Sequence, residues 1–123
     1  MKLLTYHILR FGLGITFIWI GIYIVRNPEA WSAYIRPWML ALLPASPERT
    51  MFANGLLDIA IGGLLLFNIF PWLIAALASI HLAIILIVSG INEITVRDIG
   101  LLGATLALGI ATWPQSPLRR FLP

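Results

Sequence analysis

Four long apolar segments, separated by short polar breaks, follow one another along the chain. They cover residues of about 4–26, 50–70, 71–92 and 96–113. The first three are each about 20 residues long, and a helix rising ~1.5 Å per residue crosses a hydrocarbon core of about 30 Å over that length. The fourth is shorter. The pattern therefore predicts an all-α integral membrane protein, a four-helix bundle that forms a single domain over residues 1–123.

The polar break between the first two segments carries an amphipathic pattern of its own. Its apolar residues follow the i, i+3, i+4, i+7, i+8 spacing of a helix, at Trp31, Tyr34, Ile35, Trp38, Met39 and Leu42. Aromatic residues on one face are typical of the headgroup level of a membrane. We predict an interfacial helix within residues 28–43, which Pro37 kinks or splits into two pieces. It is either an ordinary connection with aromatic anchors or a lid over the mouth of the bundle.

The second and third segments each contain one ionisable residue deep in an apolar run. If both are helices joined tightly at Pro71, Asp58 lies roughly 16 Å and His81 roughly 15 Å from that link. A lone aspartate at the bilayer centre costs about 2.5–3.5 kcal/mol even on translocon-based scales, so such a residue faces a partner or a cavity. We expect the two side chains to meet inside the bundle, with Thr16 or Trp19 at the same level.

Two interpretations of this polar layer stay open. Asp58 and His81 either hydrogen-bond each other and only hold the helices in register, or they form part of a ligand site. A quinone headgroup is one candidate, because it needs hydrogen bonds at its carbonyls and a path for protons on reduction. Asn54, one helical turn from Asp58, and Trp19 complete the candidate binding residues. No residue is predicted to be catalytic.

Polar residues also gather before the fourth segment. We predict that Arg97 and Asp98 form a structural pair with Glu93 or Arg26 at the outer surface, and contact with a substrate or anion is the alternative. A haem held by two histidines is disfavoured because His7 and His81 differ in depth by more than about 10 Å. Nor is there a histidine and carboxylate at i, i+3 or i+4, so no metal site is predicted.

Small residues recur at close-packing spacings in three of the segments. Membrane helices approach one another closely through such residues. They are Gly12 with Thr16 and Gly14 with Gly21; Gly55, Ala60, Gly62 and Gly63; and Gly100, Ala104 and Ala111, with Gly103 and Ala107. The rows on the fourth segment predict packing against the bundle and membership of a larger assembly.

Composition narrows the function classes. The chain is 60% hydrophobic and 11% charged, far from an ordinary soluble domain. It has no cysteine, which excludes disulfides, thiolate metal sites and a disulfide-generating quinone reductase. The net charge of +3 includes no basic run, so nucleic acid binding has no support.

The ends of the chain bear on topology. A signal peptide is the rival interpretation of the first segment, but that segment ends at Arg26 without a small-residue cleavage site. Within it, Arg10 is expected to snorkel towards the interface. Lys and Arg divide equally between the two sides, with Lys2, Arg10, Arg119 and Arg120 on the side of the termini. Acidic residues fall only on the other side, which favours cytoplasmic termini weakly.

Three stretches resemble the DoxX family of small four-helix membrane proteins: ILRFGLGITFIWIGIYIVRNPEAW, NGLLDIAIGGLLLF and VRDIGLLGATLALGI. The likeness covers nearly the whole chain, through diffuse apolar motifs. It implies a four-helix bundle in the bacterial or archaeal cytoplasmic membrane. Members include a subunit of a thiosulfate:quinone oxidoreductase, and many have no established activity. By position, Asp58 matches the family's acidic site and Arg97-Asp98 its fourth-helix motif.

Two function classes are compatible with these observations. The first is a small membrane subunit of a quinone-linked redox complex, with a structural or quinone-adjacent role and no covalently bound cofactor. The second is a stand-alone membrane protein that binds or transports a small molecule or lipid. The sequence leaves open whether the chain is itself an enzyme. The expected partners are membrane lipids and other membrane subunits.

Overall fold

A computed structural model describes residues 3–114. All its regular elements are helices: α1 (Leu3–Arg26), α2 (Pro28–Ser32), α3 (Pro37–Leu40), α4 (Pro47–Leu66), α5 (Pro71–Ser89) and α6 (Val96–Thr112). The prediction of an all-α chain is confirmed for this part of the sequence. Three helices, α1, α4 and α5, are long and apolar enough to cross a membrane. Lys2, Arg119 and Arg120, which bear on the predicted orientation, lie outside the described residues.

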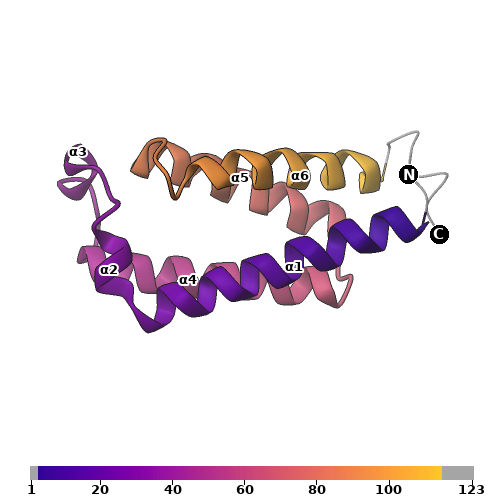
Figure 1. Cartoon of the computed structure of the whole chain (residues 1–123), viewed down its shortest axis with the longest axis horizontal. Coiled ribbons are helices and arrows are strands. Elements are labelled where there is room, and N and C mark those ends of the chain that lie inside the picture. The colour runs from indigo at the N-terminus through magenta and orange to yellow at the C-terminus, as the bar shows by residue number, and fades with distance from the viewer. Residues whose placement is uncertain (1–2, 115–123) are drawn as a thin grey trace.

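The four long helices form two layers. Figure 1 shows α1 beside α4 in one layer and α5 beside α6 in the other. A short link joins α4 and α5, but the two helices do not pack along their length as a hairpin would. Instead, α4 packs mainly on α1, and α5 packs mainly on α6. α4 and α5 are closest at their link and separate towards the end of the molecule that carries α2 and α3 (Figure 1).

The helix boundaries have local causes. Proline stands in the first turn of α2, α3, α4 and α5, where its missing N–H costs nothing. The Ser46 side chain caps α4 by accepting a hydrogen bond from the Arg49 backbone N–H at 3.2 Å. α4 is thus displaced from its predicted range of 50–70, and α5 ends at Ser89, because Gly90 has a φ of 70°.

The link between α4 and α5 is unusually tight. Asn68 and Phe70 both have positive φ, 57° and 42°. Asparagine enters this left-handed region more easily than other non-glycine residues, whereas a phenylalanine there is strained. The Tyr6 hydroxyl donates a hydrogen bond to the Asn68 side chain and so ties the start of α1 to the link.

Arg10 does not snorkel to the interface as the sequence predicted. Its side chain is 5% exposed, and Nη1 donates hydrogen bonds to the carbonyls of Leu65 at 2.8 Å and Leu66 at 2.6 Å. Nη2 donates to His7 Nδ1 at 2.8 Å, and the guanidinium lies 4.5 Å from the centre of the Phe11 ring. The last carbonyls of a helix lack partners within it and carry partial negative charge. Arg10 therefore caps α4 from the neighbouring helix.

Glycines bring α1 and α4 into backbone contact. A Cβ added at Gly62 would lie 2.5 Å from the Gly14 carbonyl oxygen, and one at Gly21 would lie 2.6 Å from that of Gly55. The two contacts are seven positions apart on each helix, which is two helical turns. The small residues predicted to serve close packing do so at these four positions.

We expect Gly62→Ala to lower the free energy of unfolding by about 1–2 kcal/mol, because the added methyl group pushes two backbones apart. Gly63→Ala is the matched control, since nothing lies within 4 Å of a Cβ there and alanine favours a helix. Thermal unfolding in one detergent compares the two. Equal midpoints would contradict the backbone contact.

In the other layer, α5 and α6 meet through small and hydroxyl side chains. The Ser79 hydroxyl donates a hydrogen bond to Thr105 Oγ1 at 2.8 Å, and a Cβ at Gly109 would lie 3.5 Å from that of Ala75. The predicted packing rows of α6 are only partly correct. Ala111 is buried, whereas open space lies beside Gly100 and Gly103, so these two glycines do not serve packing within the described chain.

The segment between α1 and α4 is two short helices rather than one interfacial helix. Pro37 begins the second helix, so it splits the segment into two pieces, one of the two predicted effects. The apolar residues of the predicted face also diverge, since Ile35 is buried whereas Trp38 is 53% exposed. A single apolar face over residues 28–43 is therefore absent.

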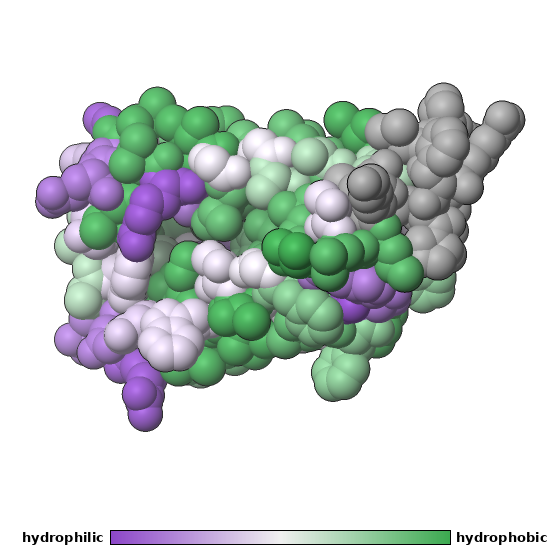
Figure 2. All heavy atoms as spheres, turned by 45° about the vertical axis from the view of Figure 1, so that its right-hand side comes forward, coloured by the Kyte–Doolittle hydropathy of each residue, from purple (hydrophilic) through white to green (hydrophobic). Residues whose placement is uncertain are grey.

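The hydrophobic core fills the half of the bundle nearest the α4–α5 link. Its members come from all four long helices and include Phe17, Leu65, Ala78 and Leu108. Figure 2 shows apolar side chains over most of the visible face, with hydrophilic ones gathered at the end that carries α2 and α3. The core ends before that end, where the layers enclose a cleft.

Candidate functional site

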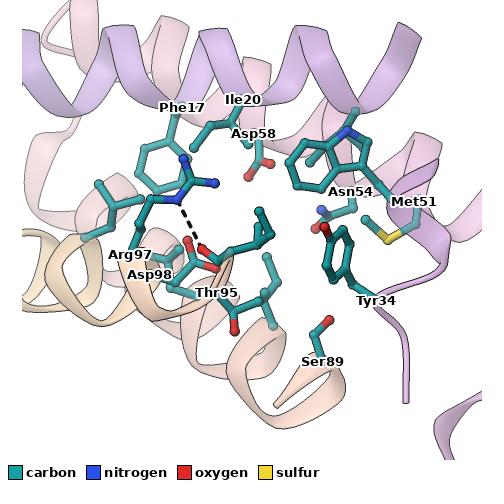
Figure 3. A pocket seen from close by; sticks show the side chains of 16 residues that line it. Phe17, Ile20, Tyr34, Met51, Asn54, Asp58, Ser89, Thr95, Arg97 and Asp98 are labelled. Atoms are coloured by element: carbon teal, nitrogen blue, oxygen red, sulfur yellow. Dashed lines mark hydrogen bonds between the residues drawn. The ribbon is translucent and has the colours of Figure 1, made fainter. Parts of the chain in front are cut away.

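The cleft lies between the two layers. Its mouth is at the end of the molecule that carries α2, and Trp31 of α2 and Tyr34 of the following turn line it. Its empty space, including the open mouth, is about 600 Å³. Most of its wall is apolar, from residues such as Phe17, Ile20, Leu82 and Leu101. The polar side chains around it are Tyr34, Asn54, Asp58, Ser89, Thr95, Arg97 and Asp98, most of which are labelled in Figure 3. Pockets for small molecules commonly combine such apolar walls with a few polar groups.

The predicted contact between Asp58 and His81 is confirmed. Asp58 Oδ1 lies 2.7 Å from His81 Nε2, and the residues are 3% and 9% exposed. They come from α4 and α5, so this contact joins the two layers of the bundle. Asp58 lines the cleft, whereas His81 is not among its lining residues and lies behind the carboxylate.

This arrangement leaves one carboxylate oxygen for a ligand. His81 contacts Oδ1, and Oδ2 has no hydrogen-bond partner within residues 3–114. In Figure 3 the Asp58 carboxylate reaches down from α4 into the cleft. A carboxylate fixed on one side by an imidazole can accept a hydrogen bond from a ligand, and the imidazole can share the proton that it receives.

Of the two other candidate binding residues, one is placed at the cleft and one is not. Asn54 is half-buried and lies on the cleft wall one turn before Asp58. Trp19 is 62% exposed and lines no part of the cleft, so its assignment is wrong. Phe17 and Ile20 occupy the place on α1 that Trp19 was expected to take. The α1 segment is apolar on every side, and this hid which face is inward.

The pairing predicted for the α6 motif is also wrong, although Arg97 is exposed as predicted. Glu93 and Arg26 are exposed, and neither forms an ion pair with Arg97 or Asp98 in the described chain. Arg97 and Asp98 instead line the cleft. Arg97 Nε donates a hydrogen bond to the Ile94 carbonyl at 3.2 Å, drawn as a dashed line in Figure 3.

A capped turn places the α6 motif at the mouth of the cleft. The Asn92 side chain accepts hydrogen bonds from the backbone N–H groups of Ile94 at 2.8 Å and Thr95 at 3.0 Å. The Thr95 hydroxyl in turn donates to the Gly90 carbonyl. The first turn of α6, with Asp98, therefore starts beside the end of α5. There Asp98 is near enough to Asp58 for the two carboxyl groups to interact electrostatically.

The sequence did not indicate that Tyr34, Ser89 and Thr95 belong to the site. Tyr34 was recognised only as a membrane anchor, Ser89 lies in the third apolar segment, and Thr95 lies in a polar break that looks like an ordinary turn. The available signal was that these residues lie near helix ends, and it becomes informative only once the arrangement of the two layers is known.

Trp31 and Tyr34 lie over the mouth, and the Arg36 backbone N–H donates a hydrogen bond to the Val88 carbonyl at 3.1 Å. The connection between α1 and α4 thus covers the mouth of the cleft.

No group of three His, Asp or Glu side chains that could hold a metal ion occurs within residues 3–114. The chain matches no protein-family model, no curated protein and no solved structure. Its resemblance to the DoxX family therefore stays a prediction from the sequence. The geometry of the cleft is accordingly the main guide to its function.

Proposed function

We propose that this protein is a small integral membrane subunit that binds a quinone headgroup in its cleft and works beside a membrane redox complex. One observation carries the proposal: the Asp58 carboxylate, held by His81, lies at the base of an apolar cleft with one oxygen unpaired. An ionisable side chain buried between apolar helices is a functional candidate by default.

The groups around the cleft match the needs of a quinone. Its two carbonyls accept hydrogen bonds, and the quinol form donates them. The Asn54 amide, the Tyr34 hydroxyl and the Arg97 guanidinium are donors near the mouth, whereas Asp58 at the base is an acceptor for a quinol hydroxyl. The apolar walls suit the ring. In this proposal the chain binds and positions the headgroup, and Asp58 exchanges a proton with the quinol hydroxyl. The partner complex carries the electrons.

The same proposal includes the membrane arrangement. α6, with 17 residues, is about 26 Å long and serves as the fourth span beside α5. Both termini then lie in the cytoplasm of a bacterial or archaeal cell, as in a DoxX-type bundle. The open face beside Gly100 and Gly103 is where another subunit's helix can approach closely.

A second candidate function is a stand-alone protein that binds or carries a lipid or small molecule. The covering segment favours it, because Trp31 and Tyr34 over the mouth would have to move for a ligand to pass. The two candidates differ in what stays bound on purification from native membranes. A quinone with redox subunits supports the first, and a different lipid on an isolated chain supports the second.

Binding of decylubiquinol, the reduced form that carries two hydroxyl groups, to the protein in lipid nanodiscs tests the headgroup site. We expect Asp58→Asn to weaken binding at least tenfold, because the amide cannot take a proton from the quinol or pair with a protonated His81. Glu93→Gln is the matched control: it makes the same change at an exposed carboxylate away from the cleft. Equal affinities of Asp58→Asn and wild type, or no binding by folded wild type, would refute the proposal.

A further inference from the structure

A second cavity adjoins the cleft. Its empty space is about 580 Å³, and it shares Met51, Asn54, Ile85 and Ser89 with the cleft wall. Beyond these four, its lining is apolar apart from Thr50. The two spaces therefore meet at the level of Asn54, one turn from Asp58.

The second cavity is lined by residues of both α4 and α5. These lie towards the end of the molecule at which the two helices separate (Figure 1). Ile35, Met39 and Leu43, from the segment around α3, line one side of the cavity. On α5 the cavity reaches Ile84, which is 52% exposed on the outer surface of the bundle. Ile84 is five residues from the end of α5, roughly 7 Å along the helix. If α4 and α5 span the membrane, this opening faces the acyl chains of one leaflet.

We propose that this second cavity is a lateral portal that holds the apolar tail of the ligand whose headgroup occupies the cleft. The inference rests on the proposed headgroup site, and it names the ligand class: an amphiphile with an isoprenoid or acyl chain. Asn54 and Ser89 border both cavities, Thr50 borders the second, and the other polar groups lie on the cleft side. The apolar lining leads from the junction to the bilayer. A tailed molecule would extend from the cleft into the portal, whereas a headgroup alone would leave the portal unfilled.

The portal also explains the weak packing between α4 and α5. Two helices joined by four residues normally pack along their length, yet these two have their main contacts with α1 and α6. The separation is maintained at one end by Ile35 and Met39, and the Arg36 backbone is hydrogen-bonded to the end of α5 at Val88. A tail can leave through this gap without the covering segment at the mouth being displaced.

The test compares a tailed with a tailless ligand. Ile84→Trp fills the rim of the portal and leaves the cleft lining unchanged, because Ile84 borders only the second cavity. We expect this variant, in detergent, to bind decylubiquinone at least tenfold more weakly than wild type and to bind the tailless ubiquinone-0 within twofold of wild type. Val88→Phe, at another residue that borders only the second cavity, should show the same split and guards against a poorly folded variant. Ile87→Trp is the control, since Ile87 is 65% exposed and borders neither cavity.

The outcomes separate the portal from the headgroup site. If Ile84→Trp and Val88→Phe weaken the binding of decylubiquinone and ubiquinone-0 to the same extent, the portal is overturned. The same holds if neither variant changes the binding of either quinone. If wild type binds neither quinone, the proposed headgroup is wrong, and mass spectrometry of co-purifying lipids then decides. Loss of a tailed lipid in Ile84→Trp but not in Ile87→Trp upholds the portal for a different headgroup. Unchanged lipid content, or no tailed lipid on wild type, overturns it.

Discussion

Arg10→Met is expected to destabilise this protein more than any of the other single substitutions proposed. The methionine keeps an apolar side chain of similar length but removes the hydrogen bonds to the Leu65 and Leu66 carbonyls. Each hydrogen bond to a charged group contributes about 1.5–3 kcal/mol, so the loss should be about 3–6 kcal/mol. The Leu65 carbonyl would keep the Asn68 backbone N–H at 3.1 Å, whereas the Leu66 carbonyl would lose its hydrogen bond at the end of α4, where water cannot easily replace the guanidinium.

Arg26→Met is the control for charge and side-chain length. Arg26 is the last residue of α1, the helix that contains Arg10, but it is exposed. Its replacement should therefore lower the free energy of unfolding by less than about 1 kcal/mol, through the lost interaction with the helix dipole. Arg10→Lys should fall between the two, because an ammonium cannot reproduce the fork of a guanidinium. Unfolding in a mild detergent, followed by circular dichroism, measures all three. Similar midpoints for Arg10→Met and Arg26→Met would mean that the cap contributes little.

The second large effect is expected at the contact between the layers. Asp58→Leu and His81→Leu should each lower the free energy of unfolding by about 2–3 kcal/mol, because each leaves a buried polar partner unpaired. The double variant should recover much of that loss, since two apolar side chains replace a buried pair without leaving an unpaired group. The coupling energy, which is the summed loss of the two single variants minus the loss of the double variant, should therefore be about 3 kcal/mol, at the upper end for residues in contact.

The same double variant separates stability from ligand binding. If it folds as well as wild type and no longer binds quinone, the pair is needed for the ligand and not for the fold. If binding persists, Asp58 and His81 only hold the layers together. A coupling energy of zero would contradict the hydrogen bond itself, whatever happens to binding.

The lengths of the apolar segments were enough to predict the long helices and that Asp58 and His81 lie at the same level. Asp58 and His81 were found because the energetic cost of an isolated charge in lipid leaves few alternatives to a buried pair. The pairing of the layers could not be predicted in the same way. A short link suggests that α4 and α5 pack together, yet the glycines at 14 and 62 decide the contact by letting two distant backbones approach.

The errors at the site come from uniform hydrophobicity. In α1 nearly every residue is apolar, so no amphipathic signal separated the inward Phe17 from the outward Trp19. Arg97 and Asp98 were expected to pair with Glu93 or Arg26, but a capped turn carries the start of α6 to the cleft mouth, where Arg97 is exposed and both residues line the cleft. Arg10 was misplaced for a related reason, since its partners are backbone carbonyls, which no side-chain pattern reveals.

The pairing of α1 with α4 has a consequence for synthesis on the ribosome. α1 is made first, but its glycine face and Arg10 find their partners only after the residues of α4 have been translated. Until then the Arg10 guanidinium lacks its acceptors on α4. The two layers can form in chain order, α1 with α4 and then α5 with α6, and completion of the first layer depends on translation of the end of α4.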